Sequence, residues 1–407
     1  MTNVSQTIEQ VAGFRVAGVA AGLKASGAED MSLIVSDRPC AAAAVFTTNL
    51  MKAAPVLLDM ERMAESAGDI RAVTVNTRCA NACTGEQGLA NAREMSRLTA
   101  DALGISESSV LVMSTGVIGT HLQMDKIAHG INLAVNALGD DWAAAARGIM
   151  TTDTRPKSAS ARIETPEGVI TIAGITKGSG MIAPNMATML GVIVTDAVLT
   201  PAQASDALKA ANDISFNRIV VDGDMSTNDT VILLANGASG IAVHPNHARQ
   251  FDEAFRAVAL SLAMAIVRDG EGATKFISLE VTGAADDASA KVIANTIATS
   301  PLVKTAFYGG DANWGRIVAA AGRANVPFDP DAVTLTMAAG LAPGAEDSLL
   351  LFENGMPTAY NEATATEIVK ASEVTVTLAV GSGPGSAIVY TCDLSHDYVS
   401  INGSYRS

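Results

Sequence analysis

A flexible loop that leads directly into an apolar run is the feature of this sequence that most constrains its fold. Residues 177–188 carry two glycines and a proline, which predict a loop, and residues 189–194 are apolar over the length of a buried strand. The junction therefore joins a segment that bends freely to one that is fixed. Thr188 occupies this junction and follows Ala187.

Thr188 has chemistry available to it at such a junction. Its hydroxyl can attack the carbonyl carbon of Ala187 to form an ester, and hydrolysis of the ester would cut the chain between the two residues. The cut would give Thr188 a free α-amine with an ordinary pKa of about 7.7 to 8.0, suited to act as the base for its own hydroxyl. On spacing alone, an ordinary turn into a core strand is the favoured interpretation.

The composition excludes several classes of protein. With 407 residues, of which 48% are hydrophobic and 4% aromatic, the chain can fill large cores, mainly with small and branched side chains. A net charge of −15 without clusters of Lys and Arg argues against nucleic acid or an anionic membrane as partner. Residues 1–10 show no signal peptide, and residues 257–267 are too short to span a bilayer. We expect a cytoplasmic protein.

The four cysteines and five histidines show no metal-ligand spacing, so we expect reduced structural thiols and no metal site. The rest of the chain alternates predicted strands and helices, which indicates an α/β (α+β layered) fold. Strands are expected at residues 14–24, 31–36, 43–47, 72–76, 110–113, 162–164, 169–173, 189–195, 231–235, 276–281, 303–308, 374–380 and 387–391. Helices are expected at residues 84–104, 124–138, 141–150, 200–212, 245–268, 289–298, 314–321 and 361–372.

Two short glycine-containing segments can present polar groups. The chain turns at Gly116, directly after a predicted strand, and adjacent N–H groups in such a turn can hold a developing negative oxygen. Glycines on both sides of Glu271 let its carboxylate project from a bend, where it can meet an ammonium group. An ordinary β-turn and a solvated acidic loop are the simpler interpretations of these two segments.

Residues 178–190 are similar, almost residue for residue, to the self-cleavage motif of the glutamate N-acetyltransferase family, also called ornithine acetyltransferases. The similarity continues in order along the chain. It covers residues 46–49, 52–55, 81–85, 114–119, 151–154, 222–224, 226–230, 269–275 and 311–316, and the tail from Asn402. The order and number of these matches make the resemblance highly specific.

The resemblance implies a fold of two interleaved lobes, with mixed sheets covered by helices. It implies self-cleavage into residues 1–187 and 188–407, and a heterotetramer of two copies of each chain. Thr188 would take acetyl from N2-acetylornithine and pass it to glutamate by a ping-pong route in arginine biosynthesis. No cofactor is implied, although acetyl-CoA could serve as a co-substrate.

The same resemblance implies roles for individual residues. Thr188 matches the nucleophile, and Thr115 and Gly116 match the oxyanion-hole pair. Lys177 could pair with a substrate carboxylate, and Glu271 with the side-chain amine of ornithine. Further substrate contacts are implied for Thr154, Asn402 and Ser407.

The chain departs from the family pattern at three places. Arg78 and Cys79 stand where a small, flexible pair is usual, and acceptor preference could differ if that loop borders the pocket. Leu50 and Met51 stand where an Arg-Val pair is common, and Ser407 stands where a threonine is usual. Serine keeps the hydroxyl and the carboxylate, so we expect a modest effect at the tail.

Other function classes share these features. An N-terminal-threonine aminopeptidase or amidase would form the same acyl-enzyme and pass the acyl group to water, and a related acetyltransferase could use another amino-acid acceptor. The formation of acetylglutamate rather than free acetate from acetylornithine separates transfer from hydrolysis. A non-catalytic binding protein would keep the chain uncut, as a single band in denaturing electrophoresis.

Overall fold

The structure, a computed structural model, describes residues 3–8, 10–183, 189–341 and 344–403, and these form two compact units. The first unit comprises Met1–Asn217 and Asp224–Ile266. The second comprises Arg218–Gly223 and Val267–Ser407. No helix among the described residues is both long enough and apolar enough to cross a membrane.

A mixed sheet organises the first unit. Its strands are β1 (Phe14–Val19), β2 (Met31–Phe46), β3 (Ile70–Asn76), β4 (Val110–Ser114), β5 (Lys157–Thr165), β6 (Gly168–Lys177), β7 (Leu190–Thr195) and β9 (Thr230–Ala235). Among the described residues these eight strands follow the order β4-β3-β2-β9-β7-β6-β5, with β1 paired to β2. The first part of β2 lies between β1 and β3, and its second part pairs with β9.

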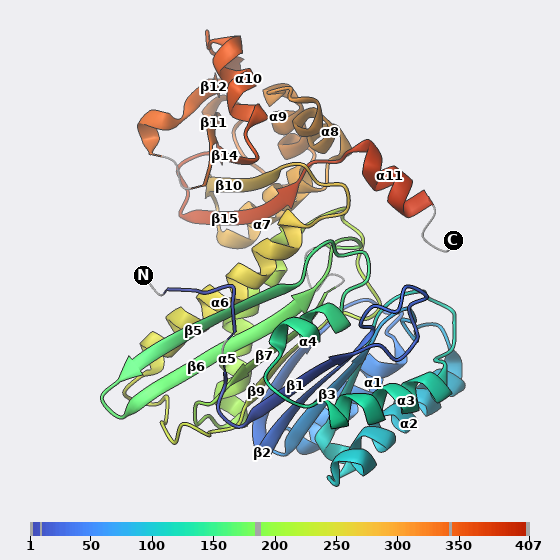
Figure 1. The fold of residues 1–407 in the computed structure, drawn as a ribbon. Helices are drawn as coiled ribbons and strands as arrows, with labels where there is room; N and C mark the ends of the chain where they lie inside the picture. Colours follow the sequence, from blue (N-terminus) through green and yellow to red (C-terminus); the bar gives the residue numbers. More distant parts are fainter. Residues whose placement is uncertain (1–2, 9, 184–188, 342–343, 404–407) are drawn as a thin grey trace. The chain divides into compact units, whose positions relative to one another are not determined.

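Helices cover both faces of this sheet. They are α1 (Ala54–Ser66), α2 (Gly85–Leu103), α3 (Met124–Asn136), α4 (Trp142–Gly148), α5 (Pro201–Ile214) and α6 (Ala248–Arg268), the last of which ends beyond the unit's boundary. Figure 1 shows α1, α2 and α3 grouped together beside β3. Because side chains alternate along a strand, Leu33 and Val35 pack with these helices, whereas Ile34 joins the core that contains Trp142 of α4.

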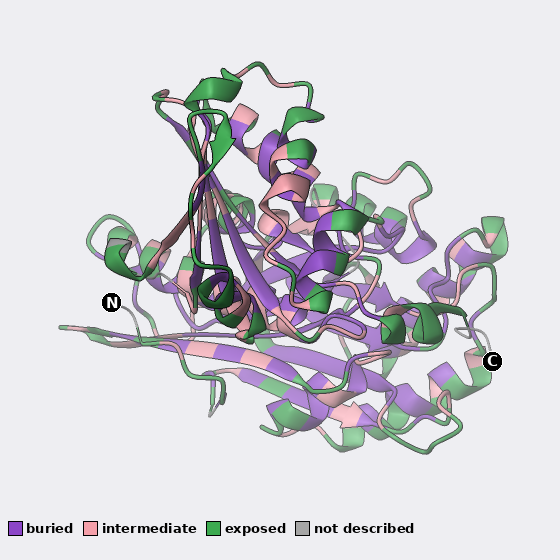
Figure 2. Cartoon of the chain, turned by 90° about the horizontal axis from the view of Figure 1, so that it is seen from above, coloured by how far each residue is buried: buried purple, intermediate pink, exposed green. Residues whose placement is uncertain are grey.

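The second unit is built on another mixed sheet, with order β13-β12-β11-β14-β10-β15-β8. Its strands are β8 (Ile219–Val220), β10 (Phe276–Ala284), β11 (Thr334–Ala339), β12 (Leu349–Glu353), β13 (Met356–Pro357), β14 (Glu373–Ala379) and β15 (Gly385–Cys392). Its helices are α7 (Asp287–Ala298), α8 (Pro301–Gly309), α9 (Trp314–Gly322), α10 (Glu362–Lys370) and α11 (His396–Gly403). Apolar residues of α7 to α10 share one core with β10, β11, β14 and β15, and Figure 2 shows buried strands beside helices whose outer faces are exposed.

The α/β fold with mixed sheets is confirmed, but the strand expected at residues 303–308 is wrong. This segment lies in helix α8. The run of Val303, Phe307 and Tyr308 favours a strand by composition, yet Val303, Ala306 and Phe307 are buried at helical spacing. Pro301 stands in the first turn of the helix, and Gly310 ends it in the left-handed conformation.

Two further differences concern the first unit. The strands expected at residues 31–36 and 43–47 are parts of the single strand β2, whose register shifts between Val35 and Cys40. Helix α1, with Pro55 in its first turn, is not among the predicted helices. The predicted chain boundary at 187/188 does not coincide with the division into units, because β6 and β7, on its two sides, pair with each other. The chain boundary itself stays a prediction.

Candidate active site

Strands β6 and β7 bring together the two ends of the predicted cleavage segment. Lys177, the last residue of β6, is the register partner of Leu190, the first residue of β7. Ala187 and Thr188 lie outside the described residues. Both flanks of the segment are held by carboxylates: Gly178 donates its N–H to Asp153 Oδ1 at 2.7 Å, and Met189 donates its N–H to Asp229 Oδ1 at 2.9 Å.

Asp153 is the centre of a buried charged cluster. Its carboxylate accepts hydrogen bonds from Lys157 Nζ at 2.6 Å and from the N–H groups of Gly178 and Thr151. Burial alone would raise the pKa of Asp153, but the charges of Lys177 and Lys157 and these hydrogen bonds outweigh it and lower the pKa to about 2. Asp153 therefore stays ionised and holds two lysines beside the start of the segment.

Lys177 links this cluster to the turn after β4. Its Nζ lies 3.4 Å from the hydroxyl oxygen of Thr115, and both side chains are buried. An ammonium group only donates, so the Thr115 hydroxyl accepts from Lys177 and keeps its own hydrogen available for another acceptor. Thr115 and Lys177, predicted as site residues from separate motifs, are thus in contact.

The turn at Thr115 and Gly116 differs in one detail from the expected pair of N–H donors. The N–H of Thr115 donates to the carbonyl of Asn76 at 3.1 Å, so it is already used. Among the described residues, the N–H of Gly116 has no hydrogen-bond partner. The turn can therefore offer an anion one backbone N–H, from Gly116, and one hydroxyl, from Thr115.

Gly116 is required by close packing as well as by its conformation. Its φ is +133°, and a Cβ at this position would lie 2.2 Å from the carbonyl carbon of Arg78. Asn228 braces the same turn, since its side-chain amide donates to the carbonyls of Ala80 and Ser114 at 2.7 and 2.8 Å. The backbone at Gly116 is consequently held from two sides.

Asp229 is the most unusual buried acid of the site. Its Oδ1 accepts from Met189, which follows Thr188 in the chain, whereas its Oδ2 has no hydrogen-bond partner among the described residues. Burial raises the pKa of Asp229 well above its ordinary range, against the hydrogen bond from Met189 and the charge of Lys177. A buried carboxyl with a raised pKa thus lies beside the end of the cleavage segment.

The second unit contains a separate polar group. Glu271 is buried, with 8% of its surface exposed, and its Oε2 accepts a 2.7 Å hydrogen bond from the side-chain amide of Asn402. The bend beside it is tight, because a Cβ on Gly272 would lie 2.6 Å from Ser395 Oγ. Glu271 and Asn402, both predicted to bind substrate, are therefore brought together. Ser407 lies outside the described residues.

The predicted site residues thus fall into two groups. Thr115, Gly116 and Lys177 belong to the first unit, and Glu271 and Asn402 belong to the second. Thr154 has an exposed side chain just before β5.

Sequence reasoning did not single out four residues of the first group. They are Asp153, Lys157, Asn228 and Asp229. Asp153, Asn228 and Asp229 stand inside matched motifs, at residues 151–154 and 226–230. The motifs therefore included these residues but did not indicate a role for them. Asp153 and Lys157 are only four residues apart, but the contacts of Asp153 with Gly178, of Asp229 with Met189, and of Asn228 with the carbonyls of Ala80 and Ser114 join distant parts of the chain.

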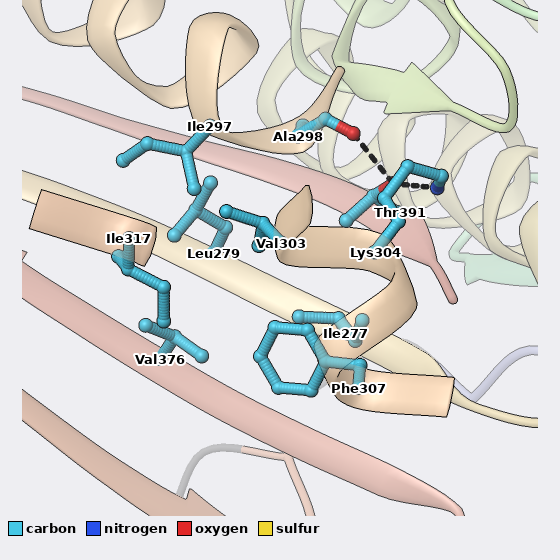
Figure 3. A pocket seen from close by; sticks show the side chains of 10 residues that line it. All are labelled: Ile277, Leu279, Ile297, Ala298, Val303, Lys304, Phe307, Ile317, Val376 and Thr391. Atoms are coloured by element: carbon cyan, nitrogen blue, oxygen red, sulfur yellow. Dashed lines mark hydrogen bonds between the residues drawn. The ribbon is translucent and has the colours of Figure 1, made fainter. Parts of the chain in front are cut away.

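A small cavity in the second unit does not have the character of a site. Its volume is about 10 Å³, and Figure 3 shows mainly aliphatic and aromatic side chains around it, among them Ile277, Val303 and Phe307. Lys304 reaches its edge, where Nζ donates to Thr391 Oγ1 at 3.0 Å and to the carbonyl of Cys392. A space of about one water molecule is a packing defect of the core rather than a binding site.

The geometry can be compared with known proteins. The model of the ArgJ family matches residues 15–407. The arginine biosynthesis bifunctional protein ArgJ of Symbiobacterium thermophilum is 48% identical over 402 residues, covering 97% of each chain. The protein of the same name from Geobacter sulfurreducens is 50% identical over 405 residues, covering 98% of this chain and all of the relative.

Solved structures are also similar to this chain. The arginine biosynthesis bifunctional protein ArgJ of Bacillus halodurans is 38% identical, with a TM-score of 0.47, and covers 52% of this chain and 96% of its own. An ornithine acetyltransferase of Mycobacterium tuberculosis in complex with ornithine is 38% identical, with a TM-score of 0.42, and covers 45% of this chain and 98% of its own. From the family match over residues 15–407 and the relatives that are about half identical, we conclude that this chain belongs to the ArgJ family.

Proposed function

We propose that this chain is a self-cleaving acetyltransferase that moves the acetyl group of N2-acetylornithine to glutamate, a reaction of arginine biosynthesis. Relatives that are about half identical carry the name arginine biosynthesis bifunctional protein. The observation that carries the proposal is the anchoring of the segment around Thr188. Asp153 holds its start at Gly178 and Asp229 holds its end at Met189, beside the Thr115 turn.

The first chemical step is self-cleavage. The hydroxyl oxygen of Thr188 attacks the carbonyl carbon of Ala187, the C–N bond of the peptide breaks, and the nitrogen takes up a proton to become the α-amine of Thr188. Water then hydrolyses the resulting ester and releases the carboxylate of Ala187. Asp229, whose carboxyl accepts the N–H of Met189, supports this step by fixing the chain directly after the nucleophile.

The second step is acetyl transfer. The α-amine of Thr188 takes the proton from its own hydroxyl, whose oxygen attacks the acetyl carbonyl of the donor. The negative oxygen that develops is stabilised by the N–H of Gly116 and the hydroxyl of Thr115, which Lys177 orients. The C–N bond to ornithine breaks, the departing nitrogen takes up the proton, and an acetyl ester remains on Thr188. The α-amine of glutamate then attacks this ester by the same steps in reverse.

Two charged residues can recognise the donor. Glu271, held in place by Asn402, offers a carboxylate to the side-chain ammonium of acetylornithine. Lys177 offers a positive charge for the α-carboxylate, and Thr154 and Ser407 would add hydrogen bonds. The proposal also includes acetyl-CoA as a co-substrate, a heterotetramer of two copies of each cleaved chain, and a cytoplasmic location.

Intact-mass measurement and product analysis test this proposal together. Purified wild-type protein should contain two fragments, the second beginning at Thr188, and should convert acetylornithine and glutamate to acetylglutamate with little free acetate. Thr188→Ala should leave one inactive chain. Thr188→Ser, which keeps a hydroxyl, is the matched control and should still be cut.

Two results would contradict the proposal. An uncut wild-type chain with full transferase activity would remove the role of the α-amine, because that amine exists only after cleavage. Release of acetate in place of acetylglutamate would identify a hydrolase.

A further inference from the structure

The first unit contains a polar cavity that the proposed function does not yet use. Its volume is about 200 Å³, and it lies where the loop after β1, the end of β3 and the loop after β4 meet. Its lining includes Leu23, Arg78, Val117, Thr120, His121 and Gln123. A space several times that of a water molecule can hold the side chain of an amino acid.

Asp30 fixes two of the segments that line this cavity, the loop after β1 and the end of β3. Its buried carboxylate accepts the N–H groups of Ala21, Leu23 and Lys24 at 2.6 to 2.8 Å, which shapes the loop after β1. Its backbone carbonyl accepts from both the N–H and the hydroxyl of Thr77, at 3.0 and 2.9 Å. One residue thus ties the loop to the end of β3, directly before Arg78.

The loop after β4 forms a further wall and is tied to the end of β3 by hydrogen bonds. Val117 donates its N–H to the carbonyl of Arg78 at 3.1 Å, and Ala80 donates its N–H to the carbonyl of Val117 at 3.0 Å. The thiol of Cys79 lies 3.1 Å from the carbonyl of Thr120. The cavity is therefore preformed, as small-molecule sites usually are.

Donor groups without partners surround this cavity. Arg78, His121 and Gln123 are exposed, and within the described residues their side chains make no hydrogen bond or ion pair, so they are available to a ligand. Lys24 is not a further free donor here, because its Nζ donates to the carbonyl of Glu29 and burial lowers its pKa. In a chain of net charge −15, a guanidinium accompanied by further hydrogen-bond donors is suited to an anion.

The backbone of Arg78 has an unusual conformation for its residue type. Its φ is +71°, a left-handed value that side chains other than glycine rarely adopt and that persists where the surroundings impose it. The same backbone packs against Gly116, where no Cβ would fit. Arg78 is an exposed residue of the cavity lining, and its backbone packs against the turn that would hold the oxyanion.

The two substrates of the proposed reaction carry opposite charges at their side-chain ends. Acetylornithine ends in an ammonium group, for which Glu271 is available, whereas glutamate ends in a carboxylate. A planar guanidinium is the group best matched to a carboxylate, because it can donate two parallel hydrogen bonds.

We propose that this cavity is the acceptor subsite, in which Arg78, with His121 and Gln123 as further donors, binds the side-chain carboxylate of glutamate. This inference rests on the proposed acetyl transfer. It predicts that Arg78 discriminates between acceptors and plays no part in taking acetyl from the donor.

Arg78→Gly is the variant of choice, since glycine accepts a φ of +71° and the backbone should keep its shape. We expect the KM for glutamate to rise about ten- to a hundredfold, as for the loss of a charge-assisted contact. The burst of ornithine released from acetylornithine before glutamate is added should be unchanged.

Arg78→Gln provides a second variant that retains a side chain. Arg93→Gln, which removes an exposed arginine of α2 paired with Glu61, is the matched control and should change neither quantity.

The choice between glutamate and glutamine is the sharper measurement. Wild-type protein should strongly prefer glutamate, and in Arg78→Gly the ratio of the two kcat/KM values should fall toward one.

A glutamate KM and a ratio that stay at wild-type values in both Arg78 variants would overturn the inference while leaving the proposed function intact. An equal loss of the ornithine burst and of glutamate use would also overturn it, because Arg78 would then support the whole site. A wild-type protein that forms no acetylglutamate would instead refute the proposed function, and the acceptor subsite with it.

Discussion

Replacing Asp153 by asparagine tests the charged cluster that anchors the cleavage segment. The substitution keeps the shape of the side chain but removes the negative charge between Lys157 and Lys177. The side chains of Asp153 and Lys157 are almost fully buried, at 0% and 1% exposed. Removing one partner of a buried ion pair typically costs about 3 to 5 kcal/mol, because a charge is left in a site that water does not reach.

The pKa of Asp153 gives an independent magnitude. A fall from the ordinary value of 3.8 to about 2 corresponds to about 2 kcal/mol in favour of the folded, ionised state. Because the folded-state pKa is the lower one, this stabilisation is fully present above pH 3.8 and is lost as the pH falls toward 2. We therefore expect the difference between wild-type protein and Asp153→Asn to be large at pH 7 and to shrink in acid.

Urea unfolding of both proteins at pH 7 and at several values below pH 4 measures these quantities. The matched control is Asp37→Asn, which removes an exposed ion pair with Arg15, in which both side chains are about half exposed. Such a pair contributes less than about 1 kcal/mol. The account of the cluster is refuted if Asp153→Asn lowers the free energy of unfolding at pH 7 no more than the control does. It is also refuted if this loss does not shrink in acid. Asp153→Asn combined with Lys157→Met should recover part of the lost stability, since one unpaired charge is removed.

Four further substitutions test the rest of the site. Thr115→Ala should lower kcat by one to three orders of magnitude, roughly the loss expected for one oxyanion donor, with little change in KM; a change confined to KM would place Thr115 in substrate binding. Gly116→Ala should lower the melting temperature and the activity together, because the alanine Cβ would lie 2.2 Å from the carbonyl carbon of Arg78. A variant with the melting temperature and activity of wild type would show that the turn can relax. Glu271→Gln should reduce kcat/KM for acetylornithine by about ten- to a thousandfold while the fraction of cut chain stays the same, and equal loss of both would assign Glu271 to the fold. Asp229→Asn should gain stability relative to wild type as the pH rises above 3.8, by up to about 1.4 kcal/mol per pH unit, because the raised pKa of Asp229 makes its ionisation in the folded state costly. A difference in the free energy of unfolding in urea that does not depend on pH would contradict this.

The sequence by itself determined the local elements of this protein and its family. Thr200 and Pro201 predicted the start of α5, where the structure has a complete capping box, and Gly104 predicted the end of α2, where it adopts the left-handed conformation. These signals work because a cap or a stop involves groups only a few residues apart. The order of the motifs, from Phe46 to the tail, was sufficient to recognise the family that the comparisons confirm.

Tertiary structure decided what depends on contacts between distant residues. The run 303–308 is a helix because its apolar side chains find a core at helical spacing, although its composition favours a strand. Asp153 meets Gly178 across 25 positions of sequence, and Asp229 meets Met189 across 40. The pairing of β5 with β6 brings the first two residues together, and the pairing of β7 with β9 brings the second two together. Arg78 was visible in the sequence as an unusual residue, but only the folding of three chain segments around it makes a cavity for its charge.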